Sequence, residues 1–251
     1  MKLQVVGIIP ARYASTRLPG KALRLIRGKP MIQRVYERCR DAEAIDALYV
    51  ATDDARIAEA VSNFGGRVIM TSPRHPSGTD RLAEAVQDLA ADIVVNIQGD
   101  QPFIDAGMIA EAVRPLLDDP ALEMSTLMHP IHREDDLCDP SVVKVVTDLA
   151  GNALYFSRSL IPYPRQRLEH AVFEHVGLYV YRRTFLLQLA QLPPTPLEQI
   201  ESLEQLRVLE HGHRLRVIET KCHDNAFSGF SVDTEADLAR AEAMLAERGL
   251  E

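Results

Sequence analysis

Short apolar runs alternate with helix-like segments through the first half of the chain, and this alternation constrains the fold more strongly than any other feature. The runs "VVGII" and "DIVVNI" are nearly continuous in apolar residues, which is typical of strands buried on both faces. Strands are predicted at residues 5–9, 48–52, 67–70 and 93–98, and helices at residues 31–40, 55–64, 79–90 and 108–117. This order predicts an α/β fold with a mostly parallel central sheet and helices on both of its faces.

The second half of the chain has a different pattern from about residue 124 onward. The segments "MSTLMHPI", "SVVKVVTD" and "FEHVGLYVY" are predicted to form longer, more antiparallel strands. No linker-like stretch separates the halves, and 251 residues suit one large domain. We therefore expect a single domain over residues 1–251, with a β-rich portion at residues 124–182.

One long helix is predicted at residues 195–212. Thr195 as N-cap and Glu198 three residues later form a capping box, Pro196 fits the first helical position, and Gly212 fits the stop. The predicted apolar face of this helix consists of Leu197, Ile200, Leu203, Leu206 and Leu209.

The composition argues against several classes of protein. The chain has 36 acidic and 28 basic residues and a net charge of −8, whereas a nucleic-acid binder needs a broad basic face. The longest apolar run, in "QVVGIIPA", is too short to cross a bilayer and lacks a signal-peptide cleavage site. The 3 cysteines share no metal-ligand spacing and make no disulfide framework. We therefore expect a cytoplasmic protein that binds neither nucleic acid nor membranes.

Positive charge is concentrated at the N-terminal end of this acidic chain. Residues 1–36 contain no Asp or Glu, and their basic residues are Lys2, Arg12, Arg17, Lys21, Arg24, Arg27, Lys29 and Arg34. The stretch "IIPARYASTRLPGK" follows the first predicted strand, and its small residues let the backbone approach a ligand closely. Arginine and lysine suit phosphate oxygens. A solvated surface loop is the alternative, but the position of the loop and its lack of acids favour triphosphate binding.

Two aspartates are candidate metal ligands. Asp100, in "VNIQGDQP", follows an apolar strand, so we expect it at the carboxyl end of the sheet, facing the cationic loop. Asp233, in "FSVDTEADL", precedes a helix predicted at residues 234–248, where Thr234 and Asp237 form the capping box and leave Asp233 without a capping role. Carboxylates in these positions suit Mg²⁺. A turn role for Asp100 and an N-cap role for Asp233 stay open as alternatives.

The segment "HVGLYVY" shows a period of two, as in a strand. One face carries Val176, Leu178 and Val180, and the other carries His175, Gly177, Tyr179 and Tyr181. His and Tyr offer both hydrogen bonds and ring surface, so the second face is a candidate polyol-binding wall, with Tyr181 expected on a half-exposed surface. Glu204 and Gln205 lie off the leucine stripe of the predicted helix and could reach the same ligand.

Taken together, these motifs resemble a known family over nearly the whole chain. "IIPARYASTRLPGK", "HPSGTDRLAEA", "VNIQGDQP", "HVGLYVYRR", "PLEQIESLEQLRVLE" and "VDTEADL" are similar to the motifs of CMP-Kdo synthetases, the 3-deoxy-manno-octulosonate cytidylyltransferases. The resemblance implies a glycosyltransferase-A-like nucleotidyltransferase fold and a cytoplasmic homodimer. It implies an enzyme that uses CTP and Mg²⁺ to make CMP-Kdo for lipopolysaccharide biosynthesis, with sugar binding and dimerisation in residues 124–182.

Carried over position by position, the resemblance implies four groups of site residues. The implied triphosphate-binding residues are Arg12, Ser15, Arg17 and Lys21, and the implied base- and ribose-binding residues are Ser77, Gly78 and Gln98. The implied metal ligands are Asp100 and Asp233, and the implied residues that bind the acid sugar are Arg158, His175, Tyr179, Glu204 and Gln205. The catalytic residues implied are Arg12, Arg17, Lys21, Asp100 and Asp233.

The expected chemistry is direct phosphoryl transfer. The anomeric hydroxyl of Kdo attacks the α-phosphorus of CTP and pyrophosphate leaves, with no side-chain general base. Three alternatives remain: a cytidylyltransferase for another acid sugar such as sialic acid or amino-Kdo, a glycosyltransferase, and a non-catalytic nucleotide-sugar-binding protein. A glycosyltransferase typically shows an Asp-x-Asp metal motif, whereas "GDQP" offers one Asp.

Overall fold

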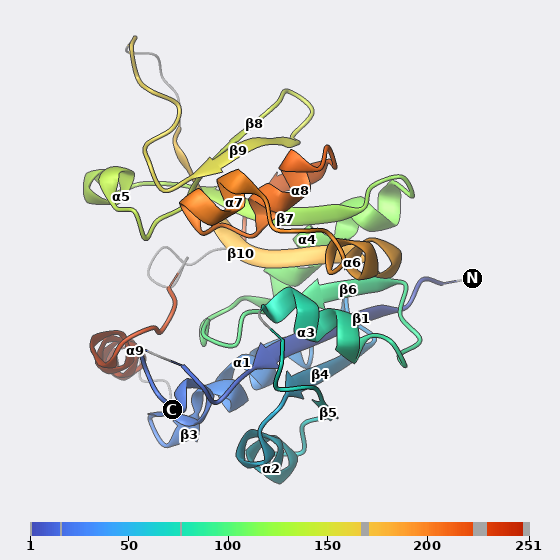
Figure 1. Cartoon of the computed structure of the whole chain (residues 1–251). Coiled ribbons are helices and arrows are strands. Elements are labelled where there is room, and N and C mark those ends of the chain that lie inside the picture. Colours follow the sequence, from blue (N-terminus) through green and yellow to red (C-terminus); the bar gives the residue numbers. More distant parts are fainter. Residues whose placement is uncertain (1, 16, 76, 167–170, 223–229, 248–251) are drawn as a thin grey trace.

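A mixed β-sheet runs through the centre of the molecule in the computed structural model, which describes residues 2–15, 17–75, 77–166, 171–222 and 230–247 (Figure 1). Its main path runs in the order β11-β7-β10-β6-β1-β4-β5. In that order the strands are Leu215–Glu219, Met124–Pro130, Phe173–Arg182, Ile93–Asn96, Val5–Ala11, Ala47–Thr52 and Val68–Met70. Strands β6, β1, β4 and β5 are parallel, as predicted, and β10 is antiparallel to both of its neighbours, β6 and β7.

Helices cover both faces of the sheet, as the alternating pattern predicts. On one face lie α1 (Met31–Cys39), α2 (Ala55–Asn63) and α4 (Ala106–Asp118), and on the other lie α3 (Gly78–Ala85) and α6 (Arg183–Leu189). An apolar cluster lies on each face of the sheet, and strand β1 contributes side chains to both. Val5 and Ile9 pack in the first cluster and Val6 and Ile8 in the second, because side chains point to alternate faces along a strand. Within the described ranges, no helix is both long and apolar enough to cross a membrane.

The second half adds strands in the three segments that the sequence pattern predicts, β7, β8 (Lys144–Thr147) and β10, and also β9 (Ala153–Ser157) and β11, which were not predicted. Strands β8 and β9 pair antiparallel, and β8 also pairs with the start of β10. The short helix α5 (Glu134–Cys138) connects β7 to this pair. Because β10 lies between β6 and β7, strands from both halves of the chain share one sheet.

The single helix predicted at residues 195–212 is wrong, because the structure divides it at Ser202. Helix α7 (Pro196–Glu201) ends where Ser202 adopts a left-handed conformation with φ of 53°, and α8 (Gln205–Glu210) follows. The predicted apolar stripe is divided with it. Leu203, Leu206 and Leu209 pack in the core, but Leu197 and Ile200 are 37% and 79% exposed. The break also directs Glu204 and Gln205 towards a cavity.

A third apolar cluster brings the two ends of the chain together. The C-terminal helix α9 (Glu235–Glu247) packs through Leu238 and Leu245 against Leu18 and Ile26 of the N-terminal segment. That segment contains the 3₁₀ helix η1 (Lys21–Leu23) and a small hairpin of β2 (Leu25–Ile26) and β3 (Lys29–Pro30). Figure 1 shows α9 beside the N-terminal segment. Burial of this cluster therefore places Asp233, two residues before α9, close to the loop after β1.

Candidate active site

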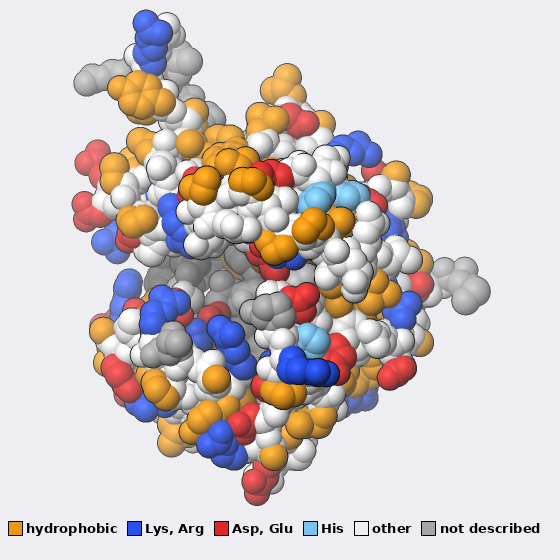
Figure 2. All heavy atoms as spheres, in the orientation of Figure 1, with side chains coloured by type: hydrophobic (Ala, Val, Ile, Leu, Met, Phe, Trp, Pro, Cys, Tyr) orange, Lys and Arg blue, Asp and Glu red, His pale blue; other side chains and the backbone are white. Residues whose placement is uncertain are grey.

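A cavity of about 310 Å³ opens beyond the carboxyl ends of β1 and β6. This is where ligands bind in open α/β sheets. Figure 2 shows a hollow between the part of the molecule that carries α7 and the part that carries α1 and α2, with Lys and Arg side chains along its lower rim. Its lining includes nine of the residues singled out in the sequence: Arg12, Ser15, Arg17, Lys21, Ser77, Gly78, Gln98, Asp100 and Asp233.

Lys21 links the two aspartates in this first cavity. Its Nζ lies 2.7 Å from Asp100 Oδ2 and 2.9 Å from Asp233 Oδ1, and its side chain is 18% exposed. Burial alone lowers the pKa of Lys21, but the charge and hydrogen bond of Asp100, together with Asp233, outweigh burial and raise that pKa above its ordinary value. Arg17 lies 3.0 Å from the same oxygen of Asp233. Two cations of the loop after β1 therefore contact the two carboxylates directly, through ion pairs that share one oxygen of Asp233.

Local structure fixes the loop that carries these cations. Gly20 precedes η1 with φ of 65°, a left-handed conformation in which glycine has no steric penalty. Beside it, the ring of Tyr13 lies 3.3 Å from the guanidinium carbon of Arg56, a cation–π contact with helix α2. Arg56 is held in turn by Asp54, the N-cap of α2. Helix α2 therefore supports the loop from outside the cavity.

Asp233 reaches the site because of how α9 begins. The Asp237 carboxylate accepts hydrogen bonds from the backbone N–H groups of Thr234 and Asp233, and Thr234 Oγ1 accepts one from the N–H of Asp237. This is the predicted capping box, and it leaves the Asp233 side chain free to face Lys21. The backbone N–H of Val232 donates to the carbonyl oxygen of Asp100 at 2.9 Å, which fixes the two aspartates side by side.

The start of α3 forms another wall of the first cavity. Ser77 is the N-cap: its Oγ accepts from the N–H of Asp80 at 3.1 Å and donates to Asp80 Oδ2 at 2.7 Å. Arg81, which was not among the predicted site residues, also lines the cavity. It is buried, donates to Thr71 Oγ1, and lies 3.4 Å from Asp53 Oδ1. Its position in "SGTDR" could have indicated a functional role, because a basic residue is unusual in the first turn of a helix.

A second cavity, of about 370 Å³, adjoins the first. Gln98 and Asp100 line both cavities, so a ligand in the second lies next to the carboxylates of the first. His175, Tyr179, Glu204 and Gln205 line the second cavity, as do Ser141 and Glu174. The structure therefore brings four of the five predicted sugar-binding residues to one place.

His175 lies in the wall of this cavity as a neutral ring. Its Nε2 is 2.9 Å from Thr126 Oγ1, and its ring packs edge-on against Phe156. Burial lowers the pKa of His175 to about 3. Next to it, Tyr179 Oη donates to Gln205 Oε1 at 3.2 Å. The half-exposed position expected for Tyr181 is wrong, because that side chain is buried against the second apolar cluster.

The neutral state of His175 predicts an acid-sensitive fold. Its pKa lies near 6.5 in the unfolded chain and near 3 in the folded one, so acid favours the unfolded state as pH falls below 6.5. We expect His175 to cost about 2 kcal/mol of folding free energy between pH 7.5 and pH 5.0. Urea unfolding of the wild type and of His175→Gln at both pH values measures this difference. Equal losses on acidification in the two proteins would contradict the prediction.

Arg158 takes a different position from the other predicted sugar-binding residues. It is not among the residues that line the second cavity. Its guanidinium donates to the carbonyl oxygens of Glu201 and Pro140 at 2.8 Å and of Ser202 at 3.4 Å. In this arrangement Arg158 supports the wall from behind, because Ser202 lines the cavity. Direct contact with a substrate carboxylate stays a prediction, and it would require Arg158 to exchange these bonds.

The paired aspartates suit a hard divalent cation. Asp100 and Asp233 already converge on one ammonium group, which shows that their oxygens can approach a common positive charge. Mg²⁺ is usually held by one or two carboxylates plus phosphates and water. Among the residues that the structure describes, no group of three His, Cys, Asp or Glu side chains could hold a metal. A metal held here would therefore depend on the two aspartates and on oxygens of a bound nucleotide.

Comparison with known proteins identifies the family of this chain. A family model for cytidylyltransferases matches residues 6–217. This match and the open α/β sheet are those of a nucleotidyltransferase. The 3-deoxy-manno-octulosonate cytidylyltransferase of Syntrophotalea carbinolica is 52% identical over 99% of this chain and 100% of its own, and that of Geobacter metallireducens is 54% identical over 94% and 95%. The chain belongs to the 3-deoxy-manno-octulosonate cytidylyltransferase family.

Solved structures extend the comparison to the fold. A CMP:2-keto-3-deoxy-manno-octonic acid synthetase complexed with CTP superposes with a TM-score of 0.91 at 46% identity, covering 98% of this chain and 99% of that one. A cytidylyltransferase from Leptospira borgpetersenii gives a TM-score of 0.64 at 17% identity, covering 98% of this chain and 88% of that one. The second likeness concerns the fold alone. The predicted α/β nucleotidyltransferase fold is therefore confirmed.

Proposed function

We propose that the protein transfers the cytidylyl group of CTP to the anomeric hydroxyl of Kdo, releasing pyrophosphate and CMP-Kdo. The observation that carries this proposal is the pair of adjoining cavities. The first is lined by Arg12, Arg17 and Lys21, and the second by groups that can hydrogen-bond a sugar, His175, Tyr179, Glu204 and Gln205 among them. Asp100 lines both. A triphosphate in the first cavity and a sugar in the second would meet at this residue.

The chain's own residues contribute mainly position and charge. Arg12, Arg17 and Lys21 would bind the triphosphate and neutralise the charge that builds on the departing pyrophosphate. His175, with a pKa of about 3, is a very weak base, so no proton transfer is assigned to it. The attacking oxygen of the sugar forms a bond to the α-phosphorus as the bond to the bridging oxygen of pyrophosphate breaks.

Mg²⁺ is the proposed cofactor, held by Asp100 and Asp233. When bound, it would neutralise phosphate charge and lower the pKa of the attacking hydroxyl. Lys21 and Arg17 hold the two aspartates in place before nucleotide binds, since Lys21 contacts both and Arg17 contacts Asp233. The proposed setting is the cytoplasm, where CMP-Kdo would serve lipopolysaccharide biosynthesis.

A pyrophosphate-release assay tests the proposal directly. The four common ribonucleoside triphosphates are each supplied with and without Kdo and Mg²⁺. We expect release only when CTP, Kdo and Mg²⁺ are all present. Sialic acid and amino-Kdo are tested in place of Kdo, and faster release with either one would transfer the assignment to that acid sugar. Tight CTP binding without turnover on any of these acceptors would instead support a non-catalytic nucleotide-binding protein.

A homodimer is part of the proposal, supported by exposed apolar side chains on one side of the molecule. Leu154 on β9 is 61% exposed, and Ile200 on α7 is 79% exposed. Figure 2 shows hydrophobic side chains gathered over α7 and at the tip of the β8–β9 turn. Apolar groups clustered in this way are typical of a surface that a partner covers.

Substitution at this surface is expected to dissociate the dimer. A charge at Ile200 would be buried without a partner in the interface, so Ile200→Glu should shift the mass from two chains to one in light scattering. Leu117→Glu is the matched control, because Leu117 is a 45% exposed apolar residue on α4. A monomeric wild type, or an Ile200→Glu variant that remains a dimer, would contradict this part of the proposal.

A further inference from the structure

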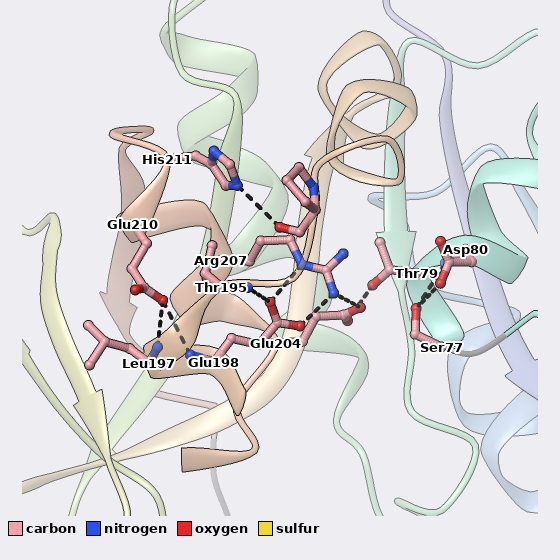
Figure 3. Close-up of polar contacts among 11 residues, drawn as sticks. Ser77, Thr79, Asp80, Thr195, Leu197, Glu198, Glu204, Arg207, Glu210 and His211 are labelled. Atoms are coloured by element: carbon pink, nitrogen blue, oxygen red, sulfur yellow. Dashed lines mark hydrogen bonds and ion pairs between the residues drawn. The ribbon is translucent and has the colours of Figure 1, made fainter. Parts of the chain in front are cut away.

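A direct hydrogen bond connects the helix that forms a wall of the first cavity to a residue that lines the second. Thr79 Oγ1 donates to Glu204 Oε2 at 2.6 Å, although the two residues are 125 positions apart in sequence. Figure 3 shows Thr79 at the start of α3 and Glu204 before α8, with their side chains pointing towards each other. Thr79 follows Ser77 and Gly78 of the first cavity, while Glu204 lines the second.

The surroundings of Glu204 make this bond important for its orientation. Among the contacts of the described residues, Thr79 supplies the one hydrogen bond to the Glu204 carboxylate. The other oxygen, Oε1, is buried without a hydrogen-bond partner there and lies 4.0 Å from the guanidinium of Arg207. A hydroxyl that donates to a carboxylate forms one of the stronger hydrogen bonds in proteins. Without Thr79, the carboxylate would lose its fixed direction.

Arg207 cannot replace Thr79 in this role, because another carboxylate holds it. Its guanidinium donates through Nε and a terminal nitrogen to both oxygens of Glu198. Glu198 in turn accepts from the backbone N–H of Thr195 at the start of α7. Figure 3 shows this chain of contacts. It fixes α7 against α8 and keeps Arg207 beside Glu204 at a distance longer than a hydrogen bond.

Thr79 is itself fixed rigidly. Thr79 is only 2% exposed. It occupies the second position of helix α3, whose N-cap, Ser77, forms two hydrogen bonds with Asp80. The donor that orients Glu204 therefore belongs to the same helix turn that forms a wall of the first cavity. A shift of this turn would move the hydroxyl away from the carboxylate.

We propose that Thr79 is a positioning residue, which holds the Glu204 carboxylate in the wall of the second cavity so that this carboxylate accepts a hydroxyl of the acid sugar there. This inference rests on the proposed function. Thr79 lines neither cavity, so its effect is exerted through Glu204 and not through contact with a substrate. Loss of its hydroxyl should weaken acceptor binding and leave nucleotide binding nearly unchanged.

The test compares Thr79→Val with Thr79→Ser in steady-state assays that vary CTP and Kdo separately. Valine keeps the shape of threonine without the hydroxyl, and serine keeps the hydroxyl. We expect Thr79→Val to raise KM for Kdo about 10-fold, because hydrogen bonds to charged groups have this strength. KM for CTP should change less than about 2-fold, and Thr79→Ser should retain the wild-type KM for Kdo. Thr79→Ala repeats the loss of the hydroxyl in case valine disturbs packing.

Several results would overturn the inference. An unchanged KM for Kdo in both Thr79→Val and Thr79→Ala would do so, as would equal increases in KM for CTP and Kdo. In a Glu204→Gln background, Thr79→Val should add little to KM for Kdo, and full additivity would also contradict the inference. The wild type is measured in the same assay to keep the two claims apart. A wild type without turnover would contradict the proposed function, whereas a wild type with turnover and an unchanged KM for Kdo in the Thr79 variants would contradict only the role of Thr79.

Discussion

Replacement of Lys21 by alanine is expected to lower kcat about 100-fold. A charge fixed in advance at a site of phosphoryl transfer is often worth about 3 kcal/mol in the transition state. Lys21 is such a charge, because it is largely buried and held by Asp100 and Asp233 within 3 Å. Its raised pKa keeps it an ammonium ion throughout the neutral range. The alanine variant also leaves two carboxylates facing each other without their shared cation.

Steady-state pyrophosphate release measures this effect at saturating CTP and Kdo. Lys29→Ala is the matched control, since Lys29 belongs to the same basic N-terminal segment but pairs with Glu37 outside both cavities. We expect its kcat to stay near that of the wild type. Near-normal turnover by Lys21→Ala would remove this residue from the mechanism, and equal losses in both variants would indicate a general effect of charge.

Replacement of Lys144 by methionine is expected to lower the free energy of unfolding by about 3 kcal/mol. Lys144 is fully buried on β8, and its Nζ donates to the carbonyl oxygens of Asp139, Val142 and Arg158 at 2.8, 2.7 and 3.0 Å. Burial is the main cause of its lowered pKa. Methionine fills the same space, but it removes the donor that these three partly buried carbonyl groups share, and each unsatisfied buried group costs about 1–3 kcal/mol.

The same substitution should also affect the second cavity. Ser141 and Val143 line that cavity and lie in the loop that Lys144 holds. We therefore expect a raised KM for Kdo together with the loss of stability. Urea unfolding gives the stability, with Lys2→Met as control because the Lys2 side chain is 79% exposed and its pair with Asp46 is worth little. Equal stability of Lys144→Met and the wild type would show that the carbonyl groups find other donors.

The sequence was sufficient for much of the first half of the molecule. The apolar runs of β1, β4 and β6 are visible because strands buried on both faces have few polar residues. The cationic loop after β1 was visible because eight basic residues without an acid are conspicuous in a chain of net charge −8. Capping boxes at Thr195 and Thr234 fixed two helix starts, since their donors and acceptors are local.

The sequence was insufficient where a local pattern competes with distant packing. The leucine-rich segment after Thr195 has a continuous helical period, yet it turns at Ser202 because Leu203 and Leu206 are buried while Ile200 is not. Lys144 and Arg158 show the same limit. Their long side chains reach backbone carbonyl groups of neighbouring loops, and nothing in the spacing of residues encodes such contacts.

By itself the sequence determined most of the helices and strands of the first half, the positive charge of the loop after β1 and the identity of most residues that line the cavities, because these depend on short-range pattern and composition. Only the tertiary structure decided that Asp100 and Asp233 share Lys21, and that Thr79 reaches Glu204. These contacts join residues far apart in the chain. They depend on the burial of α9 against the N-terminal segment and on the packing of α3 near α8, which are properties of the whole fold.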